Sequence, residues 1–182
     1  MRIFSRRSAR TLAPSALFAV LAAAGVQAAA QSADAAPQRA AAITACTTAH
    51  MKVTVSPVTR PINHLLLKAT NTGTKACYAY GAPFLRAGAD AQAPLAWDED
   101  SVPQSVVTLA PGKSAYAGIS TSTPDGEGGY KAKTLGVLFS NRALNGSVGP
   151  EKTLKLPHHG VYFNSAATVG YWQSSIGQAL FG

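Results

Sequence analysis

The chain has few of the groups that perform chemistry in enzymes. Its 182 residues include two cysteines, four histidines and eight acidic residues, and no Cys-x-x-Cys or Gly-x-Ser-x-Gly motif is present. The string nearest to a nucleophile motif, Gly118 to Ser122, falls on an expected strand, whereas a nucleophile elbow requires a strand-to-helix turn. The sequence therefore predicts a protein that is not an enzyme and that holds no cofactor.

Complete metal-binding patterns are also missing. His158 and His159 are adjacent, and adjacent side chains on a strand point to opposite faces, so both reach one ion only if the chain bends there. The acidic run at 98–100 and the loop acids at 125 and 127 lack the alternating oxygen ligands of a calcium loop. We expect solvated loops at these positions and no metal site.

A clustered basic surface is the third absence. The formal net charge is +8, but four of the sixteen Lys and Arg residues lie before residue 11. Without these four, twelve basic residues face eight acidic ones and are scattered along the chain. Nucleic-acid binding usually needs a clustered basic face, so we expect no nucleic-acid partner.

What is present begins with the pattern of a secretory signal at residues 1–28. Arginines occupy its start, an apolar stretch follows, and small residues near Ala28 and Ala30 offer cleavage sites. A retained membrane anchor is the alternative, but a spanning helix needs about 20 predominantly apolar residues, and this stretch is shorter, Ala-rich and interrupted by Pro14. Residues 29–42 are expected to form a flexible Ala-rich leader. The mature protein is then secreted, or held at the cell envelope, without a membrane segment.

The two cysteines, Cys46 and Cys77, remain after the signal. An even number of cysteines in an oxidising compartment is typical of a disulfide. A free thiol and a metal ligand are the alternatives, but neither cysteine has a Cys-x-x-Cys partner. We expect one disulfide that closes a loop of about 31 residues.

From residue 43 to residue 172 the pattern is that of short strands between turns. Apolar and polar residues alternate in several segments, Gly and Pro separate them, and no helical period is sustained. The expected strands cover 51–55, 64–70, 77–80, 84–87, 105–109, 114–121, 135–139, 153–156, 161–163 and 168–172. This pattern predicts an all-β sandwich or barrel. Residues 173–182 are expected to form a short helix or a tail that packs on it.

Several of these motifs together resemble a known bacterial family. An opening Cys46, an apolar strand ending in Asn71-Thr72-Gly73, then Cys77, the corner 81–83 and the turn at 109–112 follow in order. This frame resembles the secreted domain of unknown function 4232, over roughly residues 46–163. The resemblance implies export and an immunoglobulin-like two-sheet sandwich, and it implies no activity. The motifs themselves suit turns: Pro111-Gly112 fits the centre of a type II turn, and Asn71 and Gly73 tolerate positive φ.

Aromatic residues near loops are the remaining candidates for ligand contact. Trp97, Tyr130 and Trp172 are the predicted contact residues, since exposed rings on a rigid sandwich can stack on sugars. Alternatively, Tyr171 or Trp172 plugs one end of the core. We expect a non-enzymatic binding module whose partner is an envelope polymer, a protein or a small ligand. A structural or accessory protein without a specific ligand, and an enzyme of unrecognised type, are the alternatives.

Overall fold

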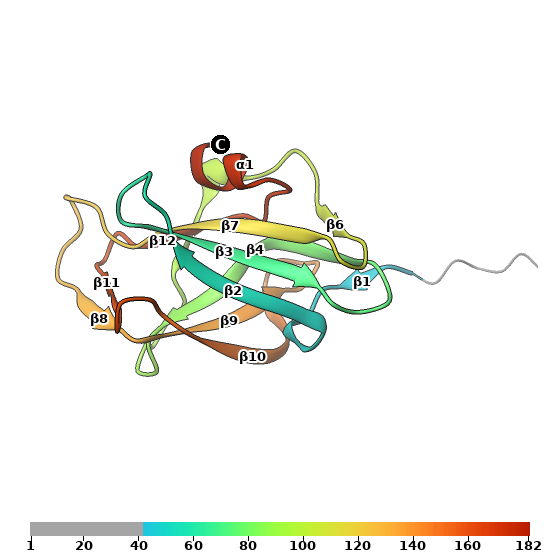
Figure 1. Ribbon diagram of the computed structural model, residues 1–182, viewed down its shortest axis with the longest axis horizontal. Coiled ribbons are helices and arrows are strands. Elements are labelled where there is room, and N and C mark those ends of the chain that lie inside the picture. The colour runs from blue at the N-terminus through green and yellow to red at the C-terminus, as the bar shows by residue number, and fades with distance from the viewer. Residues whose placement is uncertain (1–41) are drawn as a thin grey trace, which may run out of the picture. The chain divides into compact units, whose positions relative to one another are not determined.

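The computed structural model describes residues 42–182, which form two β-sheets packed face to face (Figure 1). The expected signal peptide at 1–28 and leader at 29–42 lie, except for Ala42, outside the described residues. The expected all-β two-sheet sandwich with one disulfide is confirmed.

The first sheet is built around one long strand, β4. Strand β4 pairs with β1 in parallel and with β6 and β9 antiparallel, and β10 pairs with the far edge of β9. The strands are β1 (Thr44–Ala45), β4 (Cys77–Ala87), β6 (Val107–Leu109), β9 (Thr134–Ser140) and β10 (Ser147–Lys155).

The second sheet has the order β2-β3-β7-β12-β5. Its pairs are antiparallel except the last, in which β5 runs parallel to β12. These strands are β2 (Met51–Pro57), β3 (His64–Asn71), β5 (Ala96–Asp98), β7 (Ser114–Ser120) and β12 (Thr168–Gly170). A separate two-stranded ribbon joins β8 (Tyr130–Ala132) to β11 (Val161–Phe163), and the short helices are η1 (Thr48–His50), η2 (Glu99–Ser101) and α1 (Ile176–Phe181).

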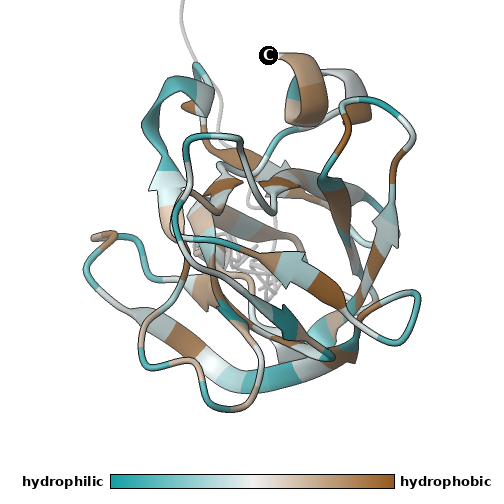
Figure 2. Ribbon diagram, turned by 90° about the vertical axis from the view of Figure 1, so that its left-hand side faces the viewer, coloured by the Kyte–Doolittle hydropathy of each residue, from teal (hydrophilic) through white to brown (hydrophobic). Residues whose placement is uncertain are grey.

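Alternation of apolar and polar residues along the strands builds the core. In β3 the buried Leu65, Leu67 and Ala69 alternate with more exposed residues, and β7 buries Ala115, Ala117 and Ile119 opposite them. Because successive side chains of a strand point to opposite faces, each sheet turns one apolar face inward. Figure 2 shows hydrophobic segments in the strands of both sheets.

The disulfide joins the start of the first sheet to β4. Cys46 follows β1 and Cys77 begins β4, with the two Cα atoms 4.9 Å apart. The amide of Cys46 also donates to Tyr78 O at 2.8 Å. The expected Cys46–Cys77 bridge is therefore confirmed, and it fixes the parallel pairing of β1 on β4.

One of the two expected turns forms as predicted. Gly112 has φ of 78° and the amide of Lys113 donates to Ala110 O at 3.0 Å, which is the geometry of a type II turn with Pro111 and Gly112 at its centre.

The turn after β3 works by a different mechanism from the predicted one. Neither Asn71 nor Gly73 has a positive φ. Instead, Asn71 is buried and its side chain bonds to the surrounding backbone: Nδ2 donates to Lys75 O and to Leu109 O, and Oδ1 accepts from the amide of Gly73. The side-chain amide therefore replaces a backbone turn.

The predicted break between residues 80 and 84 is wrong. Strand β4 is continuous from Cys77 to Ala87, but its register on β9 shifts between Tyr80 and Phe84. Gly81 lies in this irregularity with φ of 53°, a conformation that favours glycine. The Gly-Ala-Pro segment bends a strand instead of ending it, as a β-bulge does.

Helix α1 covers the outer face of the second sheet, on the side of β7 away from β9 and β10 (Figure 1). The approach is close because β7 has a glycine there: a Cβ on Gly118 would lie 2.2 Å from Ala179 O. The hydroxyl of Ser175 accepts from the amide of Gln178 and caps the helix start. No helix among residues 42–182 is long and apolar enough to cross a bilayer.

Replacing both cysteines by serine is expected to lower the free energy of unfolding by roughly 3–4 kcal/mol, because an unbridged chain gains the entropy of the open loop. Urea denaturation of the Cys46→Ser/Cys77→Ser variant measures the loss. The wild type unfolded in the presence of a reductant is the control and should match the variant. A loss below about 1 kcal/mol would contradict the assigned stabilising role.

The substitution Gly118→Ala is expected to displace α1 and to cost about 1–3 kcal/mol, since the new methyl group meets the helix backbone. Amide hydrogen exchange at Ala179 should accelerate. The matched control is Gly177→Ala, where a Cβ meets nothing within 4 Å, and which should slow exchange because alanine favours the helix. Unchanged exchange in Gly118→Ala would show that α1 is not held against β7.

Candidate functional site

The three predicted contact residues occupy three different environments. Trp172 has no exposed surface, and its ring stacks on Phe139 with the ring centroids 5.0 Å apart. Its burial corrects the prediction of a ligand contact, because the indole fills the core between the sheets, as the alternative interpretation expected. Trp97 is half-buried and Tyr130 is 50% exposed.

Trp97 forms the centre of an aromatic surface at one side of the sandwich. Its ring lies 5.1 Å from the Phe84 ring and 5.7 Å from the Tyr171 ring, measured between centroids. The indole Nε1 donates to Pro83 O at 3.3 Å, which ties β5 of one sheet to β4 of the other. A shallow cavity of about 340 Å³ opens over this cluster. We call it the Trp97 surface; it is lined by Phe84, Pro94, Leu95, Ala96, Trp97, Glu99 and Leu144.

The lack of a side chain at Gly81 allows Leu144 and Trp97 to pack closely over β4. A Cβ at Gly81 would lie 2.7 Å from a Leu144 methyl group and 3.6 Å from the Trp97 ring. Leu144, which has φ of 59° and is 40% exposed, reaches this point from the loop after β9. The missing side chain thus brings three segments far apart in sequence into one apolar surface.

A carboxylate borders the aromatic rings. The Tyr171 hydroxyl donates to Glu99 Oε2 at 2.8 Å, and Tyr171 is itself buried behind Trp97. Burial, together with the hydrogen bond and the negative charge of Glu99, raises the pKa of the Tyr171 phenol. The arrangement holds a hydrogen-bond acceptor beside an apolar ring surface.

Tyr130 lines a different and larger cavity of about 870 Å³. The cavity lies between the loop after β4, residues 88–93, and the segment 130–134, which includes β8 and the two lysines Lys131 and Lys133. The Tyr130 hydroxyl donates to Ala87 O at 2.7 Å, so the ring is fixed while half of its surface stays exposed. Trp97 and Tyr130 therefore belong to separate cavities.

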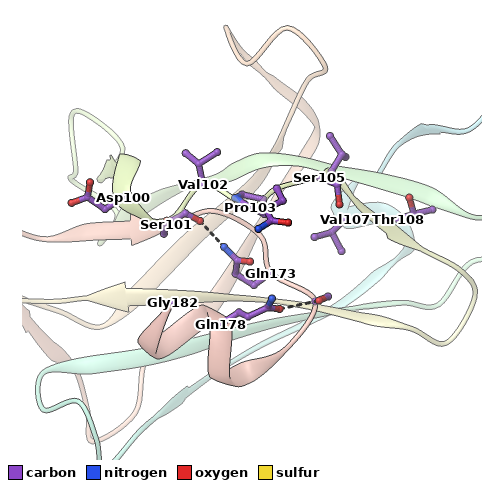
Figure 3. Close-up of a pocket in the computed structure, with 13 residues that line it drawn as sticks. Asp100, Ser101, Val102, Pro103, Ser105, Val107, Thr108, Gln173, Gln178 and Gly182 are labelled. Carbon is purple, nitrogen blue, oxygen red and sulfur yellow. Dashed lines mark hydrogen bonds between the residues drawn. The ribbon is translucent and has the colours of Figure 1, made fainter.

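A third cavity of about 520 Å³ lies between residues 100–108 and the C-terminal segment (Figure 3). In Figure 3, Val102, Pro103 and Ser105 lie across from Gln173 and Gln178. The Gln173 side chain spans the gap and donates to Ser101 O at 2.5 Å. Amide groups and small apolar side chains line it, and no titratable pair converges there.

The remaining titratable candidates do not assemble a metal site. Within residues 42–182, no group of three or more His, Cys, Asp or Glu side chains is placed to hold an ion. His158 and His159 are exposed and both have positive φ, in a turn closed by the Gly160 amide on Pro157 O. In the acidic run, Asp98 caps η2 by accepting from the amide of Asp100.

Sequence reasoning missed most partners of Trp97. Phe84 was assigned only to a strand, and its alternation with buried Leu85 was the available signal. Leu144 lies in a loop whose path no local pattern indicates, and β5, which carries Trp97, is only three residues long. The role of Gly81 follows only from the contacts that surround it.

Comparison with known proteins gives one match. The family model described as Domain of unknown function (DUF4232) matches residues 46–173. No curated protein and no solved structure matches the chain. The matched range includes both cysteines, the Trp97 surface and every strand of the two sheets except β1.

The variant Tyr171→Phe is expected to lower the free energy of unfolding by about 1–3 kcal/mol at neutral pH, since a hydrogen bond to a carboxylate is lost. The raised pKa means that the folded state binds the phenolic proton more tightly than the unfolded state. The stabilisation that comes from binding this proton is complete below the ordinary tyrosine pKa of 10.0. It is lost as the pH rises through the raised pKa of the folded state. The difference between variant and wild type should therefore shrink in alkali, measured by urea denaturation. A difference that stays constant with pH would contradict the linkage.

Proposed function

The chain belongs to the DUF4232 family, and we propose that it is a non-enzymatic binding module that holds a polysaccharide against the Trp97 surface. The observation that carries this proposal is a half-exposed indole fixed on three sides, by Phe84, Tyr171 and Pro83 O. The proposed place of action is the cell envelope or the medium.

The chemistry of the Trp97 surface suits a sugar ring. One face of a hexose presents C–H groups, and these pack on the electron-rich face of an aromatic ring. Leu144 and Phe84 extend the apolar area beside Trp97. Glu99 adds an acceptor at the border, where it can receive a hydrogen bond from a sugar hydroxyl. An apolar surface with one or two placed polar groups is the common composition of a ligand site.

Rigidity of the surface supports binding without catalysis. The ring of Trp97 loses little freedom on contact, because its Nε1 and both neighbouring rings already hold it. A ligand therefore meets a surface that needs no reordering, which lowers the entropic cost of association. The Glu99 carboxylate is engaged with the Tyr171 hydroxyl, an arrangement that supports a binding role for this acid.

Two further tyrosines lie on β4, the strand that carries Phe84, and can lengthen the contact with a polymer. Tyr78 and Tyr80 are half-buried and their rings lie 5.5 Å apart, directly before Gly81. A polymer that follows β4 would pass from the Trp97 surface to this pair. The disulfide beside Tyr78 supports an extracellular setting, since disulfides persist where the medium is oxidising.

Replacing the central ring is expected to abolish polysaccharide binding while the fold persists. The variant Trp97→Ala should bind at least about tenfold more weakly than wild type to insoluble peptidoglycan sacculi, chitin or cellulose in a sedimentation assay, because central aromatic anchors carry most binding energy. Thermal unfolding verifies that the variant is folded.

The matched control is Phe181→Ala, which removes a ring that is 69% exposed on α1. This variant should bind as the wild type does. The proposal would be wrong if the wild type sedimented with none of the three polymers, or if folded Trp97→Ala bound as tightly as Phe181→Ala.

A further inference from the structure

Three of the lysines that are scattered in the sequence lie in segments that the fold brings together. Lys131 lies in β8, Lys133 follows it, and Lys155 ends β10. Thr134 pairs with Lys155, and the amide of Leu156 donates to Lys133 O at 2.9 Å, so the backbone at Lys133, between β8 and β9, lies next to the end of β10. The fold thus brings together two segments that each carry a lysine, although these lysines are 22 positions apart in the chain.

The turn after β10 adds the two adjacent histidines to this group. Lys131 packs its aliphatic stem on the turn: a Cβ at Gly160 would lie 3.1 Å from Lys131 Cγ. His158 and His159 precede that glycine and both are exposed. We call this group the basic end; it consists of Lys131, Lys133, Lys155, His158 and His159.

The ammonium groups of the three lysines are free for a ligand. All five side chains are exposed. Within residues 42–182 the ion pair found joins Arg86 to Glu151 at 2.8 Å, and none of the three lysines lies within salt-bridge distance of a carboxylate. One acid, Asp90, lines the 870 Å³ cavity together with Lys131 and Lys133.

A cavity beside the lysines provides room for such a ligand. Lys131 and Lys133 line it together with Tyr130, whose ring is held by its hydrogen bond to Ala87 O. The opposite wall is the loop 88–93, which contributes three alanines together with Asp90 and Gln92. The cavity therefore combines two lysines and an aromatic ring with an alanine-rich wall that also carries the carboxylate of Asp90.

We propose that the basic end and its cavity bind a flexible chain of closely spaced phosphate groups. Lysine ammonium groups are compact point charges that can contact phosphate oxygens from any direction. No arginine, whose planar fork matches carboxylates, belongs to the basic end. Lysines in β8, in the bend after it and at the end of β10 suit several anionic groups in succession better than a single ion.

The test uses the mature chain and long-chain inorganic polyphosphate as the probe, with binding measured by isothermal titration calorimetry at two salt concentrations. The triple variant Lys131→Glu/Lys133→Glu/Lys155→Glu should bind at least about tenfold more weakly than wild type, since reversed charges repel the chain. Binding by the wild type should weaken as salt rises because the contacts are exposed.

The matched control is Lys52→Glu/Lys75→Glu/Lys113→Glu, which makes the same change in net charge with exposed lysines elsewhere. This control variant should bind polyphosphate with an affinity within about twofold of wild type, because salt screens charges that lie far from the binding site. Equal losses in both triple variants would overturn the proposal in favour of net charge alone. Orthophosphate that competes as well as polyphosphate at equal phosphate concentration, or polyglutamate that binds as tightly, would also overturn it.

Polysaccharide binding serves as an independent readout. The basic-end variant should still sediment with the polymer that the wild type binds, because Trp97 lies in a separate cavity. A loss of both activities in a folded basic-end variant would contradict the assignment of two separate sites.

Discussion

The backbone at Gly81 is the constraint on which the arrangement of this molecule depends. Its positive φ lets β4 bend without ending, and its carbonyl accepts the amide of Trp172 at 2.9 Å. That bond places the Trp172 ring against Phe139 in the core. On the other side of the same glycine, the absent side chain lets Leu144 and Trp97 close together. One residue thus connects the core to the surface that we assign to ligand binding.

The sequence was informative where local rules decide the structure. Alternation identified β3 and β7 and their inward residues, and the cysteine count identified the disulfide. The sequence was misleading where contacts between distant residues decide the structure. The Gly81 segment was expected to separate two strands, because glycine and proline usually punctuate, yet partners on β9 keep the strand continuous. Short strands such as β5 and β8 carry too few residues for a period to be visible.

The same dependence on contacts between distant residues explains why the candidate sites could be predicted only in part. The choice between an exposed and a buried Trp172 could not be made locally, and the structure resolves it through the stacking on Phe139. The lysines of the basic end lie in three segments, and only the pairing of β9 with β10 and of β8 with β11 makes them neighbours. Trp97 and Tyr130 were found by residue type, but their partners Leu144, Phe84 and the loop 88–93 come from the fold.

The most direct measurement uses the two tryptophans of the chain as probe and internal reference. Their two indole N–H resonances can be followed in a ¹⁵N–¹H correlation spectrum of wild-type protein titrated with soluble chito- or cello-oligosaccharides. The account predicts that the Trp97 indole signal shifts with saturation, whereas the Trp172 signal, from a ring with no exposed surface, stays in place. Spectra in which neither signal moves, or in which both move alike, would contradict the assignment of the Trp97 surface as the binding site.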